Sequence, residues 1–156
     1  MHFHRLEKIW LGFGLSMLVL FLLILGVLGF AMGMSPPSVN HHSIDPTKVN
    51  ETPPFDQPGL KQIGDKEYEA VMTAFVFGYN PGNMEVPVGS TVHFTVTSPD
   101  VVHGFEIPGT NVNMMVVPGE VSHVSYKFDK PGEYLILCNE YCGIGHEMMK
   151  TTLVVK

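Results

Sequence analysis

Two patterns of hydrophobic and polar positions divide the chain. From Ile9 to Met34 no residue is charged. As a helix this run would span roughly 39 Å, against about 30 Å for the hydrocarbon core of a bilayer. From Tyr68 onward, short runs alternate between apolar and polar residues and are separated by turn signals. The chain therefore predicts one membrane-spanning helix followed by a domain of short β-strands.

The apolar run is explained better by a membrane helix than by a cleaved signal peptide. A signal peptide has a shorter apolar region that ends at a small-residue cleavage site, whereas this run ends at a Ser-Pro-Pro sequence that stops a helix. Arg5 and Lys8 precede the run, and no Lys or Arg follows it until Lys48. The positive-inside rule therefore predicts a cytoplasmic N-terminus, with the rest of the chain on the outer face of the membrane.

The pattern after residue 66 is typical of a β-sandwich. Between Ser90 and Ser98, three apolar residues (Val92, Phe94 and Val96) alternate with polar ones, as in a strand with one buried face. Further strands are predicted at 67–78, between the Pro-Gly turns at 117–120 and 130–133, at 134–137 and at 152–155. Regularly spaced short strands without a helical period indicate a sandwich of about 90 residues.

Residues 36–66 separate the two patterns and are rich in Pro, Asn, Asp and Gln. Prolines favour an extended backbone, so this segment is expected to be a semi-extended linker. The predicted organisation is a cytoplasmic stub and transmembrane helix at 1–35, a linker at 36–66 and an all-β domain at 67–156.

The charge of the part of the chain that follows the apolar run limits the classes of partner that can be expected. Fourteen of the fifteen acidic residues and seven of the nine basic ones follow the apolar run, which gives this part a formal charge of -7. Such a charge disfavours nucleic acid and favours a basic protein partner, of which a basic cytochrome is one example. Membrane lipid is the other expected contact.

Metal-ligand chemistry is concentrated between the last two predicted strands. This segment reads C-N-E-Y-C-G-I-G-H-E-M-M and contains Cys138, Glu140, Cys142, His146 and Met149, while His103 follows an earlier strand in T-S-P-D-V-V-H-G-F. Thiolate, imidazole and thioether donors suit copper and do not suit magnesium or calcium. One copper ion needs one thiolate, whereas two thiolates four residues apart on one loop can each bridge two ions, with a His at either side.

The spacing H-(x)34-C-x-E-x-C-x3-H-x2-M resembles the CuA domain of haem-copper oxidase subunit II and of nitrous oxide reductase. The resemblance implies a cupredoxin-like Greek-key β-sandwich and a centre of two copper ions. The implied ligands are His103, Cys138, the carbonyl of Glu140, Cys142, His146 and Met149. The implied function is subunit II of a cytochrome c oxidase: the copper pair accepts electrons from a cytochrome c and passes them to the haem of subunit I, where oxygen is reduced.

Several finer expectations follow from the same resemblance. A single N-terminal helix and the stretch A-F-V-F-G-Y-N-P are similar to the B-type oxidases, which implies the plasma membrane of a prokaryote. The aromatic residues Phe75, Phe77 and Tyr79 are expected near the docking surface for the electron donor, although one buried sandwich face explains their alternation equally well. The Glu140 carboxylate is a candidate ligand for magnesium at the interface with subunit I, which B-type relatives can lack.

Glu7 lies immediately before the membrane helix, and two roles are open for it. In the first role it is a simple end charge, because a carboxylate at the N-terminal end of a helix interacts favourably with the helix dipole. Its expected cytoplasmic position also suits the entrance of a proton-uptake path, a role that the resemblance to the B type implies.

Three other functions remain open at this point. The chain is also compatible with the CuA subunit of a nitric oxide reductase complex, in which only the partner differs. A membrane-anchored copper-binding or copper-delivery protein is a second alternative, although its metal should exchange readily. A structural domain with one disulfide is a third, because the outer compartment is oxidising, but it leaves His146 and Met149 without a use.

Overall fold

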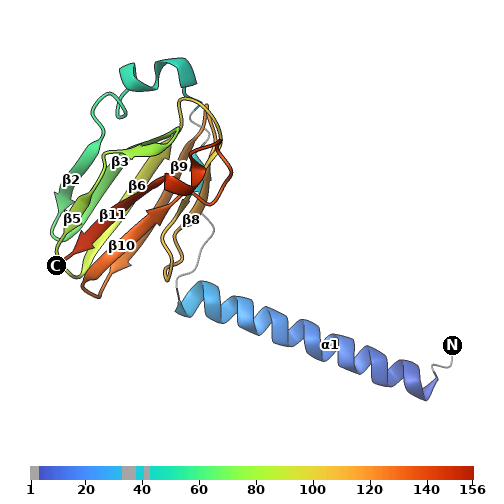
Figure 1. Cartoon of the computed structure of the whole chain (residues 1–156). Helices are drawn as coiled ribbons and strands as arrows, with labels where there is room; N and C mark the ends of the chain where they lie inside the picture. Colours follow the sequence, from blue (N-terminus) through green and yellow to red (C-terminus); the bar gives the residue numbers. More distant parts are fainter. Residues whose placement is uncertain (1–3, 33–37, 41–42) are drawn as a thin grey trace. The chain divides into compact units, whose positions relative to one another are not determined.

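The computed structural model of the chain describes residues 4–32, 38–40 and 43–156. The contacts within it divide the chain into two compact units, Met1–Pro36 and Pro37–Lys156. Figure 1 shows the first unit as a helix and the second as a sandwich of two sheets.

The first unit is the predicted apolar helix. Helix α1 (Arg5–Gly26) continues into a π-helical turn, η1 (Val27–Ala31), and together they form 27 residues that are long and apolar enough to cross a membrane. The helix begins with a capping box, in which the His4 ring accepts from the N–H of Leu6 and the Glu7 carboxylate accepts from the N–H of His4. The end of the apolar run predicted at Met34 lies outside the described residues.

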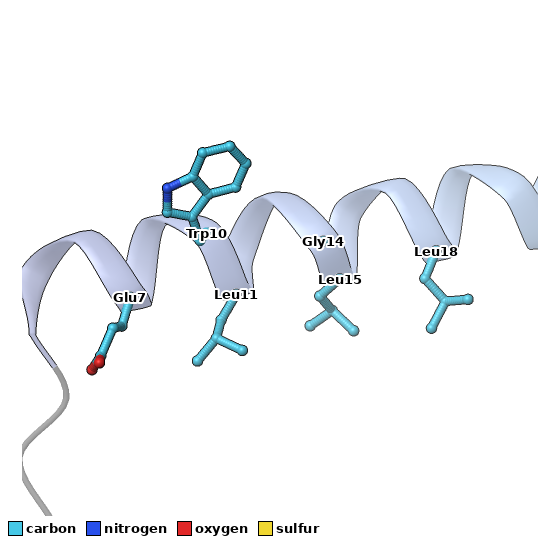
Figure 2. Close-up of a pocket in the computed structure, with 6 residues that line it drawn as sticks. All are labelled: Glu7, Trp10, Leu11, Gly14, Leu15 and Leu18. Atoms are coloured by element: carbon cyan, nitrogen blue, oxygen red, sulfur yellow. The ribbon is translucent and has the colours of Figure 1, made fainter.

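One face of α1 combines a carboxylate with a row of leucines. Figure 2 shows Glu7, Leu11, Leu15 and Leu18 pointing to the same side of the helix, and Trp10 pointing to the other side. These spacings of four, four and three residues are those that place side chains on one helical face. Glu7 therefore lies at the N-terminal end of an apolar face.

The second unit contains two packed sheets. The first sheet has the strand order β1-β9-β6-β3-β2, with β4 paired to the end of β3. Its strands are β1 (Ser38–Asn40), β2 (Gly59–Gly64), β3 (Glu67–Phe75), β4 (Gly78–Asn80), β6 (Ser90–Thr97) and β9 (Val121–Phe128). The second sheet has the order β5-β11-β10-β7-β8. Its strands are β5 (Met84–Val86), β7 (His103–Glu106), β8 (Asn113–Val116), β10 (Gly132–Leu137) and β11 (Lys150–Val155).

The core between the sheets follows the alternation that the sequence predicted. Val92, Phe94 and Val96 of β6 are buried, and they pack in one cluster with residues of the opposite sheet such as Phe105 and Leu153. β3 pairs in parallel with β6, and β5 pairs in parallel with β11, whereas the other pairings are antiparallel. The predicted β-sandwich is therefore present, with the copper-ligand candidates at one of its ends.

The structure differs from the prediction in residues 43–66, which the sequence assigned to a linker. Within this segment β2 pairs with β3, and a 3₁₀ helix, η2 (Pro46–Glu51), precedes it. Val49 and Phe55 are almost completely buried in a second apolar cluster with Ile44, Val71 and Val121. Val71 alternates along β3 with the main-core residues Ala70 and Met72, so this cluster covers the outer face of the first sheet. This segment therefore packs on the domain through its apolar residues and β2.

Candidate metal centre

The loop between β10 and β11 and the start of β7 bring the candidate ligands together at one end of the sandwich. β10 ends at Leu137, directly before Cys138, and β11 begins at Lys150, directly after Met149. Because β10 and β11 pair along their whole length, the two ends of the ligand loop are fixed by the sheet. A short 3₁₀ helix, η3 (His146–Met148), shapes its second half. Figure 1 shows this loop at the end of β11 opposite to the C-terminus. His103 is the first residue of β7 in the same sheet.

The donor atoms form a compact set around the two sulfur atoms. The Sγ atoms of Cys138 and Cys142 lie 3.9 Å apart, and both cysteines are free and buried. The Sγ atom of Cys138 lies 4.0 Å from Nδ1 of His103 and 3.1 Å from the carbonyl oxygen of Glu140. His103, Cys138 and Cys142 form a group whose ligand atoms all lie within 4.8 Å of one another.

The second sulfur has its own neighbours. The Sγ atom of Cys142 lies 3.6 Å from Nδ1 of His146 and 3.6 Å from Sδ of Met149. Each thiol therefore has one imidazole beside it, and the two thiols lie between the imidazoles. This donor set fits two soft or borderline metal ions that share two thiolates, and it offers no hard-oxygen cage of the kind that magnesium or calcium needs.

Asp100 orients the buried ligand candidate His103. Its carboxylate accepts a 2.8 Å hydrogen bond from Nε2 of His103, which leaves Nδ1 directed toward Cys138. It also accepts from the N–H groups of Val76, at 2.8 Å, and Val101, at 2.6 Å. Desolvation raises the pKa of Asp100, but these hydrogen bonds outweigh it, so the pKa lies below its ordinary value. Carboxylates in this position fix the tautomer of metal-binding histidines.

Burial raises the pKa values of two neighbouring groups, the Cys142 thiol and the Tyr79 hydroxyl. Desolvation, followed by the neighbouring Cys138, raises the pKa of the Cys142 thiol from 9.0 to about 11. Desolvation and the two cysteines also raise the pKa of Tyr79 well above its ordinary value. The Tyr79 hydroxyl therefore remains a hydrogen-bond donor at neutral pH.

The aromatic residues predicted near a docking surface divide into two groups. Phe75 and Phe77 are exposed, and the Phe77 ring lies on the ligand loop, where a Cβ atom at Gly145 would be 2.7 Å from it. Gly143 has a positive φ of 131° and lies under the same ring, so the loop needs glycine here for both conformation and space. Tyr79 is buried, with 7% of its surface exposed, and its hydroxyl donates to the carbonyl of Gly104.

Two residues that support the site were not identified from the sequence. Asp100 lies in the quoted T-S-P-D-V-V-H segment, and its spacing of three residues from His103 was the only available signal. Gly104 is visible in the sequence only as the glycine that follows His103, and this position does not reveal its contact with Cys138. The Glu140 side chain is exposed on the ligand loop, and Glu7 belongs to the separate helical unit.

Comparison with known proteins gives the family. Residues 79–156, half of the chain, match the family model of the cytochrome c oxidase subunit II periplasmic domain. A cytochrome c oxidase subunit 2 from Thermus thermophilus is 46% identical over 153 residues, which cover 96% of this chain and 91% of that protein. Another cytochrome c oxidase subunit 2 from the same species is 48% identical over 122 residues, 77% of this chain and 90% of that protein.

Solved structures agree with this relationship. A chain in the cryo-EM structure of a haem-copper terminal oxidase dimer superposes with a TM-score of 0.82 at 33% identity, covering 97% of this chain and all of that one. The periplasmic domain of cytochrome oxidase subunit II from Bradyrhizobium japonicum superposes with a TM-score of 0.53 at 23% identity, covering 56% of this chain and 83% of that one, and shows the fold alone.

These comparisons bear out the predicted fold class, a cupredoxin-like Greek-key β-sandwich that follows an N-terminal apolar helix. They also agree with the donor set, since the His, Cys, Cys and Met cluster is consistent with a CuA centre. The helix anchors the chain in a membrane, and the matched domain is periplasmic in the family. The chain belongs to the cytochrome c oxidase subunit II family and is a subunit of a haem-copper oxidase complex.

Proposed function

We propose that this chain is the electron-entry subunit of its oxidase, holding two copper ions through His103, Cys138, the Glu140 carbonyl, Cys142, His146 and Met149. The observation that carries the proposal is the 3.9 Å separation of two free, buried thiols with one imidazole beside each. Copper bound there would supply one-electron redox chemistry. The protein supplies a donor loop that is clamped between two paired strands, which limits rearrangement when the oxidation state changes.

Metal analysis combined with electron paramagnetic resonance tests this proposal. The full chain in detergent, loaded with copper, is expected to contain two ions per chain and one unpaired electron shared equally by both. One ion per chain with the hyperfine splitting of a single copper would contradict it. Co-purification with the large subunit and haem analysis would then show whether the complex contains a haem that can accept the electron.

The donor is expected to be a cytochrome c that docks on an apolar patch beside the ligand loop. The patch consists of two loops with exposed side chains, Phe75, Val76, Phe77, Val101 and Val102. Asp100 ties the two loops together through its contacts with the N–H groups of Val76 and Val101. The net negative charge of the outer part of the chain, formally -7, favours a basic donor. Tyr79 is buried, so its part in electron entry would be indirect.

The rate at which a cytochrome c reduces the copper centre tests this docking surface. Phe75→Ala should slow the second-order reduction of the copper centre by a reduced basic cytochrome c at least threefold, with an unchanged electron paramagnetic resonance spectrum. Ile63→Ala is the matched control, because Ile63 is an exposed apolar residue of β2, outside the patch. Equal rates in both variants would remove Phe75 from the docking surface.

A magnesium ion is proposed at the interface with subunit I, held by the exposed Glu140 carboxylate. A carboxylate is the hard oxygen donor that magnesium prefers. The backbone carbonyl of Glu140 remains available to the copper site. Glu140→Gln should lower the magnesium content of the purified complex while the copper content stays the same. Unchanged magnesium content, or none in the parent complex, would refute this role.

We also propose that the N-terminus lies in the cytoplasm of a prokaryotic cell and that Glu7 lies at the entrance of a proton-uptake path. The placement of Arg5 and Lys8 before the helix supports this orientation. Glu7→Gln is a selective test, because glutamine keeps an oxygen that can accept from the His4 N–H. Steady-state oxygen reduction should slow, whereas the copper content and the oxidation of cytochrome c in the first turnover should stay the same. Turnover and pH dependence equal to those of the parent would leave Glu7 as a helix cap.

A further inference from the structure

The buried hydroxyl of Tyr79 is part of a short chain of contacts that reaches a copper-ligand sulfur. It donates a 2.7 Å hydrogen bond to the carbonyl oxygen of Gly104, the residue that follows His103. The N–H group of Gly104 donates in turn to Sγ of Cys138, at 3.3 Å. Gly104 is therefore held by the tyrosine on one side and contacts the sulfur on the other.

Gly104 is the position at which β7 and the ligand loop come into backbone contact. A Cβ atom at Gly104 would lie 2.6 Å from the backbone nitrogen of Asn139, a separation that no side chain allows. Asn139 is itself fixed, because its Nδ2 donates to Oδ1 of Asn113 at 3.0 Å. Only glycine lets the strand approach closely enough for its N–H group to reach the sulfur of Cys138.

A hydrogen bond to a metal-bound thiolate withdraws electron density from the sulfur. This stabilises the reduced metal, whose extra electron increases the negative charge on its ligands, and so it raises the reduction potential. The effect depends on the N–H group staying in place, and the Tyr79 hydroxyl is the side-chain contact that holds the Gly104 carbonyl.

We propose that Tyr79 is a positioning residue that holds the Gly104 N–H group on the Cys138 sulfur and thereby raises the reduction potential of the copper pair. This inference rests on the proposed function, since it needs copper bound at Cys138. It gives Tyr79 a role inside the protein, distinct from contact with the electron donor.

Tyr79→Phe isolates the hydroxyl. The Tyr79 ring packs edge-to-face against Phe105, with 5.8 Å between ring centroids, and a phenylalanine ring can keep that contact. Tyr134→Phe is the matched control, because the Tyr134 hydroxyl also donates to a backbone carbonyl, that of Lys130, near the start of β10. The start of β10 is the end of the strand away from Cys138.

The first measurement is the reduction potential of the copper-loaded full chain in detergent. Tyr79→Phe should keep two copper ions and shift the redox equilibrium at least threefold toward the oxidised form, about 28 mV at 59 mV per tenfold for one electron. Tyr134→Phe should leave the potential at the parent value. A Tyr79→Phe potential equal to that of the control, or loss of copper from this variant, would overturn the inference.

The second measurement uses the copper-free chain and so separates this inference from the proposed function. Hydrogen exchange at the Gly104 amide should be at least threefold faster in Tyr79→Phe than in the parent and unchanged in Tyr134→Phe. Equal exchange in all three proteins would refute the positioning role, whatever metal the site holds. A parent chain that holds no copper pair would refute the proposed function and the effect on potential together.

Discussion

Removing the Asp100 carboxylate should destabilise the chain and weaken copper binding, although Asp100 is not an expected ligand. The carboxylate accepts from Nε2 of His103 and from the N–H groups of Val76 and Val101. The His103 side chain is completely buried. Asp100→Ala therefore leaves a buried ring nitrogen without its hydrogen-bond acceptor and releases the loop that contains Val76.

The expected magnitude follows from these contacts. A buried donor that loses its acceptor costs about 1–3 kcal/mol of the free energy of unfolding. The two backbone N–H groups are at the surface and can bond to water, so they add little. Loss of the group that orients a metal-binding imidazole typically lowers metal affinity by about 10–100-fold. A 10–100-fold loss is about 1.4–2.8 kcal/mol, so copper affinity and the stability of the copper-free chain should fall by similar amounts.

Urea unfolding of the copper-free full chain in detergent, followed by circular dichroism, measures the first effect, and competition with a copper chelator measures the second. Asp129→Ala is the control, because Asp129 is exposed and its ion pair with Lys127 should contribute less than about 1 kcal/mol. If Asp100→Ala changed the unfolding free energy and the copper affinity no more than this control, the hydrogen bond to His103 would have no role in orienting the ligand.

Three further predictions concern other parts of the chain. Cys138→Ser or Cys142→Ser should abolish the electron paramagnetic resonance signal of the copper pair, because thiolates bridge the two ions. Met149→Leu should keep two copper ions at an altered reduction potential, because a thioether is a weak ligand. Spectra unchanged in both cysteine variants would contradict the assignment. Phe55→Ala should lower the unfolding free energy by about 3 kcal/mol in urea titration, because Phe55 is buried, whereas a residue of a free linker would give no change. The copper-free chain should lose stability as pH rises from 9.0 to about 11, because the Cys142 thiol ionises at lower pH in the unfolded chain than in the folded one. A pH titration of unfolding at a fixed urea concentration checks this, and constant stability would contradict the raised pKa.

The parts of the fold that the sequence predicted correctly are those in which the signal is local. The membrane helix follows from an uncharged run, and β6 follows from the alternation of Val92, Phe94 and Val96. The ligand loop was also predictable, because five of its six expected donors lie within twelve consecutive residues. His103 lies far away in sequence, but the spacing of the family motif includes it.

Residues 43–66 were predicted wrongly because their burial depends on a surface that sequence patterns do not reveal. Their prolines and polar residues have the composition of a linker. Val71 and Val121 point away from the main core and form an apolar patch on the outer face of the first sheet. Phe55 and Val49 cover that patch, so the few apolar residues of the segment decide its structure.

The supporting residues of the metal centre could not be predicted for a related reason. Cys138 can be recognised as a candidate from its place in the ligand loop, but its hydrogen bond comes from Gly104, 34 residues earlier in the chain. That contact requires β7 to lie against Asn139, which in turn requires a residue without a side chain. Tyr79 completes the arrangement from β4, a strand of the other sheet. The candidate ligands can therefore be picked out because their spacing resembles that of the family motif. The groups that would set their redox properties come from both sheets, and they become visible only when the sandwich is assembled.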